Sequence, residues 1–340
     1  MKRNKASHFA LRYQSGMMKK ISRMVGGKDH LLQWLQKNLG LGRASAYRRL
    51  NGETLFDLEE IIMIISEFKI PVTELFESDK SILYFYQELT QPKSYEEWFQ
   101  RLEQDFSKLV LEPNCKMYYT STESPIFYYF HFDEFTHFKL YIWAKTIWQF
   151  EDLKDIPFNP KNDIWNDKVK DLKSKFLINY TQLPSVEFWT PNFLSNNLNQ
   201  IQYFLEGYHF ADRNDALLLC DQLRSMLKLL EEQTRTGHKV PVDGCDVPGT
   251  YELYYNEILH TNNTILFTSD TSKALYNTFG NPNTIKTKQD SACEYVEGWF
   301  HNLKKSSLKM SIESDRDRMR LFRKLEEKIN KAERLFIGLI

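Results

Sequence analysis

Apolar residues recur at every third or fourth position through the first forty residues, which is the spacing of one face of a helix. Residues 8–25 predict a first helix, whose apolar stripe comprises Phe9, Tyr13, Met17, Ile21 and Met24. Gly26-Gly27 interrupts this pattern, and Asp29 is placed to cap a second helix. The buried face of the second helix is predicted to comprise Leu31, Leu32, Leu35 and Leu39.

Residues 39–53 predict a sharp turn followed by a short third helix. Gly40 gives the backbone the freedom that such a turn requires, and Gly42 occupies the N-cap position. Ala46 and Leu50 are four residues apart and form the packing face of a helix over 43–50. The opposite face is predicted to carry Arg43, Ser45 and Arg48, with Ala44 and Tyr47 beside them.

Helical patterning continues to residue 76. Asp57 and Glu60 have the spacing of an N-cap residue and of the glutamate that completes a capping box. The isoleucine-rich helix that they open, which runs through Phe68, is predicted to be buried. Pro71 then starts a short helix whose packing residues are Val72, Leu75 and Phe76. Residues 1–76 are therefore predicted to form an all-helical domain of five helices.

The run from Leu39 to Glu53 resembles the DNA-reading segment of bacterial helix-turn-helix transcriptional regulators of the Cro/repressor-like class. The whole chain is similar to one-component regulators in which such a domain precedes a long aromatic-rich C-terminal region. Two positions depart from the family pattern. Gln36 stands where a small residue is usual, and Arg49 stands where an apolar residue is usual, so Leu50 is expected to take the packing role.

The resemblance implies that helix 43–50 enters the major groove of duplex DNA. The residues expected at this interface are Arg43, Ala44, Ser45, Tyr47, Arg48, Arg49, Lys28 and Lys37. Arg43 and Arg48 can each donate two parallel hydrogen bonds to O6 and N7 of a guanine. Ser45 and Tyr47 can reach a base edge or a phosphate. The two lysines and Arg49 are better placed for phosphates, which position a protein without reading the sequence.

The rest of the chain predicts a connector at 77–93 and a mainly helical, aromatic-rich region at 94–236. A helix is expected to end at Leu109, followed by a strand at 116–121. The densest aromatic stretch, 125–150, has an ambiguous period and is interpreted as mostly helical, because Phe135 and Phe138 continue at steps of three or four. Further helices are predicted at 162–178, 193–206 and 212–235.

Short segments separated by turn residues begin at Gly237 and predict a small α/β region at 237–340. Strands are predicted at 252–260, 264–269 and 273–279, joined as a β-meander, and helices at 289–304 and 313–336. This arrangement resembles the ligand-sensing modules found behind DNA-binding domains. The predicted fold class is mainly α with a smaller α/β part.

Charge is distributed unevenly along a chain whose net charge is zero. Residues 1–50 hold twelve Lys or Arg and one acidic residue, Asp29, which gives this segment a net charge of +11. The remaining residues therefore carry a net charge of −11. A basic segment that coincides with the helix-turn-helix pattern favours nucleic acid as the partner. A solvated basic tail is the alternative interpretation.

Other features of the sequence argue against a secreted or membrane protein. No run of about 18 apolar residues is present, and no apolar stretch follows the basic N-terminus. The four cysteines lie far apart and are expected to be thiols in a reducing cytoplasm; they are Cys115, Cys220, Cys245 and Cys293.

No motif predicts an enzyme, a cofactor or a metal site. Two groups contain metal-ligand residue types: His131, Asp133, Glu134 and His137, and Glu294, Glu297 and His301. Neither group has the paired spacing of a metal hydrolase. Interleaved aromatic residues favour a structural role for the first group, and a solvated polar face is the more usual reason for the second.

The sequence therefore predicts a cytoplasmic, sequence-specific transcriptional regulator that binds double-stranded DNA. A homodimer is expected, through helix 212–235 or through the stripe of the last helix, which comprises Met319, Phe322, Leu325 and Ile329. Packing of these helices on the same chain is the equally weighted alternative. An unknown small ligand or protein is expected to act on the C-terminal region. The alternative function is that of a protein-interaction adaptor whose helix-turn-helix does not bind DNA.

Overall fold

The computed structural model describes residues 2–68, 91–259, 262–279 and 282–340, with side chains at residues 10, 11 and from 13 onward. The chain divides into two compact units, 1–84 and 85–340, which are described separately below. The predicted short helix at 71–76 and most of the predicted connector at 77–93 lie outside the described residues. Within the described part, the fold is mainly helical with one mixed β-sheet, in agreement with the predicted fold class. No helix of that part is both long enough and apolar enough to cross a membrane.

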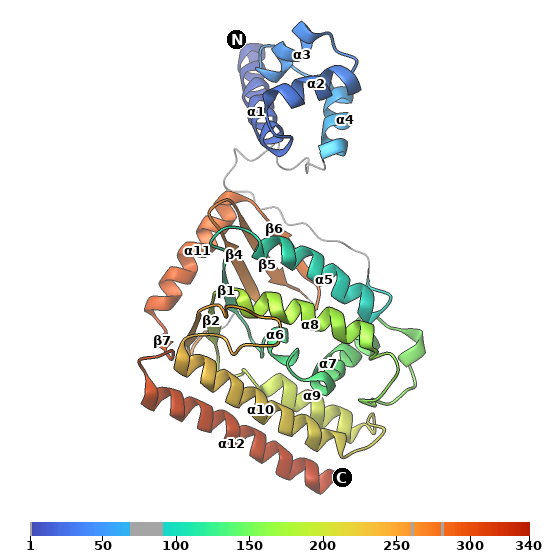
Figure 1. Ribbon diagram of the computed structural model, residues 1–340, viewed down its shortest axis with the longest axis vertical. Coiled ribbons are helices and arrows are strands. Elements are labelled where there is room, and N and C mark those ends of the chain that lie inside the picture. The colour runs from blue at the N-terminus through green and yellow to red at the C-terminus, as the bar shows by residue number, and fades with distance from the viewer. Residues whose placement is uncertain (1, 69–90, 260–261, 280–281) are drawn as a thin grey trace. The chain divides into compact units, whose positions relative to one another are not determined.

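The described part of the N-terminal unit consists of four helices (Figure 1): α1 (Lys2–Met24), α2 (Lys28–Asn38), α3 (Arg43–Leu50) and α4 (Leu58–Phe68). Their inward faces form one apolar core that comprises Met17, Met18, Ile21, Leu31, Leu32, Leu35, Ala46, Leu50, Phe56 and Ile64. The turn between α2 and α3 contains Gly40 at φ +64°, as its predicted role in a sharp turn requires. Gly42 is the N-cap of α3, as predicted.

Three predictions about this unit are wrong in detail. Met24 of the predicted stripe is exposed, and Met18, which is not part of that stripe, is buried. Asp29 lies in the first turn of α2, where the N-cap is Gly27. The isoleucine-rich helix α4 buries only Ile64 completely, and its neighbour Ile62 is exposed. The apolar residues of α4 cover a wider arc than the face that packs, so the sequence pattern alone does not identify that face.

Gln14 fastens α1 to the segment that leads from α3 to α4. Its buried amide group donates to the carbonyl oxygens of Arg49 at 2.8 Å and Thr54 at 2.7 Å. Its carbonyl oxygen accepts from the backbone N–H of Phe56 at 2.8 Å. One side chain thereby bonds to three backbone groups, at the end of α3 and in the segment that follows it. These bonds fix the path of the chain between α3 and α4.

The C-terminal unit contains eight α-helices among its described residues: α5 (Tyr95–Val110), α6 (Ile126–Tyr129), α7 (Asp133–Thr146), α8 (Asp167–Gln182), α9 (Ser195–Glu206), α10 (Asp215–Thr236), α11 (Asp290–Lys305) and α12 (Asp315–Leu339). Its strands are β1 (Lys116–Thr120), β2 (Ser185–Trp189), β3 (Tyr251–Tyr255), β4 (Thr264–Thr268), β5 (Lys273–Thr278), β6 (Thr284–Thr287) and β7 (Leu308–Lys309). The strands form one sheet in the order β6-β5-β4-β1-β2-β3-β7. The central strands β1, β2 and β3 are parallel, and the outer pairings are antiparallel.

The predicted division at residue 237 does not separate two sheets or two compact units. β1 and β2 come from the region predicted at 94–236, and they pair with β4 and β3 from the region at 237–340. The predicted β-meander is also corrected, because β3 pairs with β2 and β7, whereas β4, β5 and β6 form the meander. Turn residues show where strands end, but they do not show which strands become neighbours.

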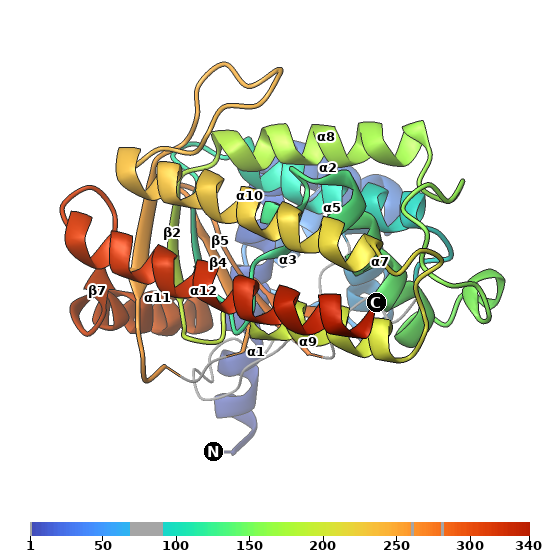
Figure 2. The same ribbon diagram turned by 90° about the horizontal axis from the view of Figure 1, so that it is seen from below.

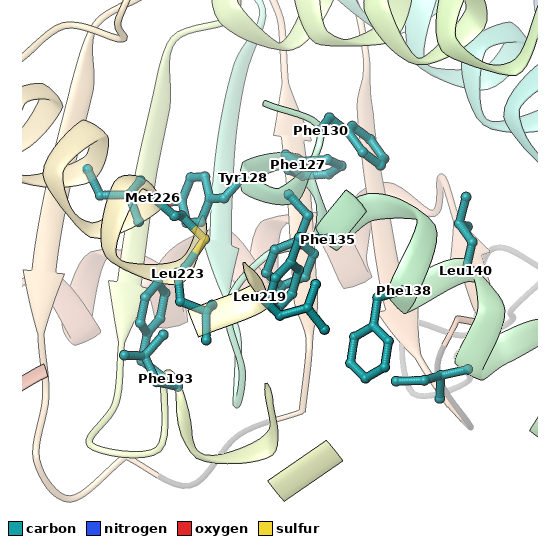
Figure 3. Packing of buried hydrophobic residues seen from close by; sticks show 14 of the residues in the cluster. Phe127, Tyr128, Phe130, Phe135, Phe138, Leu140, Phe193, Leu219, Leu223 and Met226 are labelled. Carbon is teal, nitrogen blue, oxygen red and sulfur yellow. The ribbon is translucent and has the colours of Figure 1, made fainter. Parts of the chain in front are cut away.

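Helices cover both faces of the sheet unequally (Figures 1 and 2). α11 packs on one face through a small cluster that includes Tyr118, Phe188 and Phe300. The other helices lie on the opposite side and enclose the large core, part of which is shown in Figure 3. Every residue of α7 from Phe135 to Ala144 is buried in this core. The aromatic stretch therefore has no solvent-facing side, which explains its ambiguous period.

The two helices proposed for dimerisation pack on each other in the same chain. α10 and α12 lie side by side and run in opposite directions, since the backbone N–H of Ile312 donates to Thr234 at one end and Arg213 donates to Leu339 at the other (Figure 2). Phe322, Leu325 and Ile329 are buried, whereas Met319 is 65% exposed. The predicted stripe therefore serves mainly as an intramolecular packing surface.

Candidate functional site

The exposed face of α3 is narrower than predicted, and it carries four side chains. Arg43, Ala44, Tyr47 and Arg48 are exposed, and the tyrosine side chain is 55% accessible. A helix turns by about 100° per residue, so these four positions span about 140° of its surface. Ala46 and Leu50 lie on the other side and are buried, as predicted. The helix thus packs by one face and presents two guanidinium groups and a phenol on the other.

Ser45 and Arg49 are half-buried beside the packing face, which corrects their predicted placement with the exposed residues. Arg49 donates to the hydroxyl of Ser45 at 2.6 Å and through Nε to Glu60 at 3.0 Å. Glu60 also forms the predicted capping box with Asp57: the backbone N–H of Asp57 donates to the Glu60 carboxylate at 2.9 Å, and the backbone N–H of Glu60 donates to the Asp57 carboxylate at 2.8 Å. The guanidinium group of Arg49 therefore links α3 to the start of α4, in place of the predicted phosphate contact.

Lys28 and Lys37 are both exposed, near opposite ends of α2. Nine residues of helix separate them, which corresponds to about 14 Å along the axis. Exposed basic residues also occupy the last two turns of α1, at Lys19, Lys20 and Arg23. The described part of this unit therefore carries positive charge on three of its helices.

Several residues of the two groups of metal-ligand residue types are engaged by other protein groups. Asp133 pairs with Lys173, and Glu134 accepts from Gln222. His137 is buried with its ring stacked on Trp165 at 5.5 Å. In the second group, Glu297 pairs with Lys273 at 2.7 Å. Among the residues that the structure describes, no three His, Cys, Asp or Glu side chains are arranged to hold a metal ion.

We expect His137 to make the stability of the C-terminal unit depend on pH. Burial lowers the pKa of this histidine to about 4, so the folded state keeps the ring neutral. The unfolded chain takes up a proton as the pH falls below about 6.5, and the folded unit then loses about 3 kcal/mol of stability by pH 4. Urea unfolding followed by tryptophan fluorescence at pH 7.5, 5.5 and 4.5 measures this loss.

His137→Leu should reduce this pH dependence, and His301→Leu, at an exposed position of α11, should leave it unchanged. Equal pH dependence of His137→Leu and the unaltered protein would show that another group is responsible. His131 has its pKa lowered by burial in the same direction, so some dependence remains in the His137 variant.

A cavity of about 280 Å³ lies in the C-terminal unit, where α5, the loop after β1, α7 and the strands β4–β6 meet. Its wall contains nine aromatic residues beside charged and polar ones; the aromatic residues are Trp98, Phe106, Tyr119, Phe127, Tyr129, Trp143, Trp148, Phe267 and Tyr276. The loop after β1 leaves the sheet at the carboxyl end of a parallel strand, which is the usual position of ligand sites in α/β folds. The sequence alone did not locate this cavity.

A buried ion pair lines one part of this cavity. Lys139 is 1% exposed, and its ammonium group donates to Glu123 at 3.2 Å, Asn197 at 3.3 Å and Gln200 at 2.7 Å. Glu123 is 7% exposed. One feature of the sequence indicates this pair: Lys139 is the only Lys, Arg, Asp or Glu in the mainly apolar run 135–144. A lysine buried in such a run requires a counterion.

A second buried polar cluster surrounds Glu187 on β2, which does not itself line the cavity. Its carboxylate accepts from the hydroxyl groups of Tyr128 and Tyr180, the latter at 3.0 Å, and from Ser185 at 3.1 Å. Burial raises the pKa of Glu187, and burial lowers the pKa of Lys239 to about 7. Lys239 donates to the carbonyl oxygens of Tyr180 and Leu183, both at 2.7 Å, so these groups connect the end of α8 to β2 and to the segment that follows α10.

No protein-family model, curated protein or solved structure matches this chain. The function is therefore argued from the two features described above: the exposed face of α3 in the N-terminal unit and the cavity in the C-terminal unit.

Proposed function

We propose that the protein is a cytoplasmic, sequence-specific DNA-binding transcriptional regulator, in which α2 and α3 form a helix-turn-helix. The observation that carries this proposal is the two-sided character of α3. Its packing face is fixed by Ala46, Leu50 and the Arg49–Glu60 pair, and its free face holds Arg43, Tyr47 and Arg48. A helix of about 10–12 Å diameter fits the major groove of B-DNA, which is about 12 Å wide.

The geometry supports a division of roles within this unit. Arg43 and Arg48 are about 7.5 Å apart along the helix axis, which corresponds to about two base-pair steps, so they can address neighbouring bases. Tyr47 lies between them on the same face, and Ala44 leaves room for a base methyl group or for close approach. Lys28 and Lys37 on α2 are exposed and are assigned to phosphates. Ser45 and Arg49 are removed from the proposed contacts, because they bond to each other and to Glu60.

A homodimer remains part of the proposal, because one small helix-turn-helix seldom makes enough contacts for specific binding. The buried faces of α10 and α12 are excluded as its interface, since they pack on each other. Selection from random duplex pools at near-physiological salt tests this point. We expect enrichment of a palindrome with half-sites about one helical turn apart.

Replacing Arg43 or Arg48 with Ala should weaken binding to the selected sequence by about 1–3 kcal/mol each, because a bidentate contact to guanine is lost. Fluorescence anisotropy with the selected duplex measures this effect. Arg320→Ala, at an exposed position of α12, is the matched control and should bind normally. Lys37→Ala should weaken binding to all sequences alike and reduce the salt dependence by about one counterion.

Unchanged affinity of both arginine variants would contradict the assigned face of α3. A protein that enriches no sequence and shows no salt-dependent binding to duplex DNA would instead favour the protein-interaction adaptor.

A further inference from the structure

A groove of about 610 Å³ lies where α10 and α12 pack side by side in the C-terminal unit (Figure 2). Its floor is apolar, because Leu227 and Phe322 line it and are only 5% and 4% exposed. Met319 also lines the groove, and it is 65% exposed. Methionine side chains adapt to different apolar partners, so Met319 offers a contact that packing within the chain leaves mostly unused.

The groove is basic, although it belongs to an acidic part of the chain. Residues 51–340 together carry a net charge of −11. Five of the residues that line the groove are nevertheless lysine or arginine, and only two are acidic, Glu231 and Glu326. Positive charge is therefore concentrated here against the trend of the region, and a concave basic surface attracts anionic groups.

Three of the five cations have no carboxylate partner in the part of the chain that the structure describes. No acidic side chain there lies within ion-pair distance of Lys228, Arg316 or Arg320. Arg224 is different, because it pairs with Glu333. The exposed ammonium and guanidinium groups of the other three residues are thus available to a partner.

The spacing of the arginines on α12 adds repulsion within the helix. Arg316 and Arg320 are four residues apart, and Arg323 follows three residues later, so their side chains lie near one another. Like charges at these spacings destabilise a helix. The pair of Arg323 with Glu327, at 3.8 Å between exposed side chains, offsets little of this cost. A partner that supplies carboxylates would relieve the repulsion.

The composition of the groove favours a protein segment over a nucleic acid. Arginine binds carboxylates and phosphates alike through paired hydrogen bonds. A nucleic-acid backbone is charged at every nucleotide, so it would also bring phosphates close to Glu231 and Glu326. Its phosphates offer no apolar group to Met319. A peptide can place acidic side chains at the cations and apolar side chains at the methionine.

The dimensions of the groove fit a short helix. The lining residues span positions 224–231 of α10 and 316–326 of α12, which correspond to about 10 and 15 Å along the two axes. Two to three turns of a helix have this length. A third helix laid between two neighbouring helices packs as helices do in a bundle, and an amphipathic helix in a groove is a common form of peptide recognition.

We propose that this groove binds an acidic, amphipathic helix of a partner protein. Carboxylates of that helix contact Lys228, Arg316 and Arg320, and its apolar residues pack on Met319. The groove lies wholly within the C-terminal unit, so the proposal goes beyond the DNA-binding function and does not depend on it. Binding can be measured without DNA, and a failure of either proposal leaves the other standing.

Selection of random 16-residue peptides displayed on phage, with the immobilised full-length protein, tests the proposal. We expect enriched peptides to contain at least three Asp or Glu, with Leu, Phe or Met at steps of three or four. Fluorescence anisotropy of the tightest peptide, made with a label, should show at least tenfold weaker binding at 500 mM salt than at 50 mM. No enrichment, or enrichment of peptides without acidic residues, would overturn the proposal.

A charge-reversal variant shows whether the selected peptide occupies the groove. Arg316→Glu, Arg320→Glu should weaken its binding at least tenfold. Lys324→Glu, Lys331→Glu is the matched control, because these lysines are exposed on the same helix and do not line the groove. The control makes the same change in net charge and should bind the peptide within twofold of the unaltered protein. Equal weakening in both variants would show that only net charge matters, and it would overturn the assignment.

Two further measurements distinguish this partner from other occupants. Met319→Ser should weaken peptide binding several-fold, because an apolar contact is lost, and unchanged affinity would contradict an amphipathic partner. Duplex DNA that displaces the peptide would assign the groove to nucleic acid. A dimer of the unaltered protein that dissociates in the Arg316→Glu, Arg320→Glu variant, measured by sedimentation, would assign it to a second copy of the chain. Either of these last results would overturn the proposal.

Discussion

Replacing Lys139 with Met is expected to destabilise the C-terminal unit by about 3–5 kcal/mol. Methionine fills nearly the same volume, so the loss is electrostatic and not a packing defect. The substitution leaves the Glu123 carboxylate 7% exposed without its cation, and it leaves the side-chain oxygens of Asn197 and Gln200 without this donor. Breaking a buried ion pair by removing one partner costs about this amount, because a charge remains uncompensated in a medium of low polarity.

Urea unfolding measured by tryptophan fluorescence tests this prediction, since six of the seven tryptophans lie in the C-terminal unit; the exception is Trp34. Lys286→Met is the matched control. Lys286 and Asp105 form a lysine–carboxylate pair that lines the same cavity, but their side chains are 40% and 50% exposed. Exposed ion pairs contribute at most about 1 kcal/mol to the free energy of unfolding. A loss below about 1 kcal/mol for Lys139→Met would show that the Glu123 charge is compensated by other groups.

The double variant Lys139→Met, Glu123→Gln distinguishes the cost of the unpaired carboxylate from the cost of the lost hydrogen bonds to Asn197 and Gln200. If the main cost of the single change is an uncompensated carboxylate, then neutralising that carboxylate should recover part of the loss. Additive losses in the double variant would instead assign the cost to Asn197 and Gln200.

Local structure was predictable where a helix has one buried face and one exposed face. The helices at 43–50, 212–235 and 313–336 were predicted within a few residues of α3, α10 and α12, because each alternates buried and exposed positions at helical spacing. β2 was missed for the opposite reason. All five of its residues are buried, so the segment has no alternation, and Glu187 in its centre makes it less apolar than a typical central strand.

The exposed face of α3 was predicted only in part. Arg43 and Arg48 are exposed, but Ser45 and Arg49 face the packing side. Angular positions follow from the helical repeat, and they place Ser45 and Arg49 on one side, four residues apart. The partner that holds Arg49 is Glu60 on the next helix, and such a tertiary contact cannot be read from the composition of α3.

The cavity is a property of the assembled fold. Its wall takes residues from α5 and α7 and from the meander, which begins more than 100 residues after α7 in the sequence. The aromatic content of 125–150 was evident from the sequence, but whether aromatic side chains fill a core or leave a space depends on how distant elements approach. The resemblance therefore led to the expectation of a ligand in the C-terminal region, but it did not locate a site.

Replacing Gly249 with Ala is expected to destabilise the C-terminal unit by at least about 3 kcal/mol, because the backbone of another segment occupies the space of the methyl group. A Cβ atom at this position would lie 2.5 Å from the carbonyl carbon of Leu183 and 2.7 Å from the oxygens of Gln182 and Leu183. These atoms belong to the backbone at the end of α8 and cannot turn away as a side chain can. The glycine is thus required by close approach, since its φ does not lie in the left-handed region.

The backbone of Gly249 also holds two other segments. Its N–H donates to Thr181 at 2.8 Å, and its carbonyl oxygen accepts from the N–H of Lys239 at 3.0 Å. Any shift that relieves the clash lengthens these bonds and displaces Thr250, whose carbonyl accepts from Ser185 at the start of β2. The substitution is therefore expected to weaken the parallel pairing of β2 with β3 as well.

Gly298→Ala in α11 is the matched control, because a Cβ atom there has nothing within 4 Å. Alanine is favoured over glycine inside a helix, so this change should stabilise the same unit by about 0.5–1 kcal/mol. The midpoint of urea unfolding should therefore fall for Gly249→Ala and rise for Gly298→Ala. A Gly249→Ala protein as stable as the Gly298→Ala protein would mean that the end of α8 can move away from β3 at little cost, and the buried contacts of Lys239 at that point would then not fix the sheet.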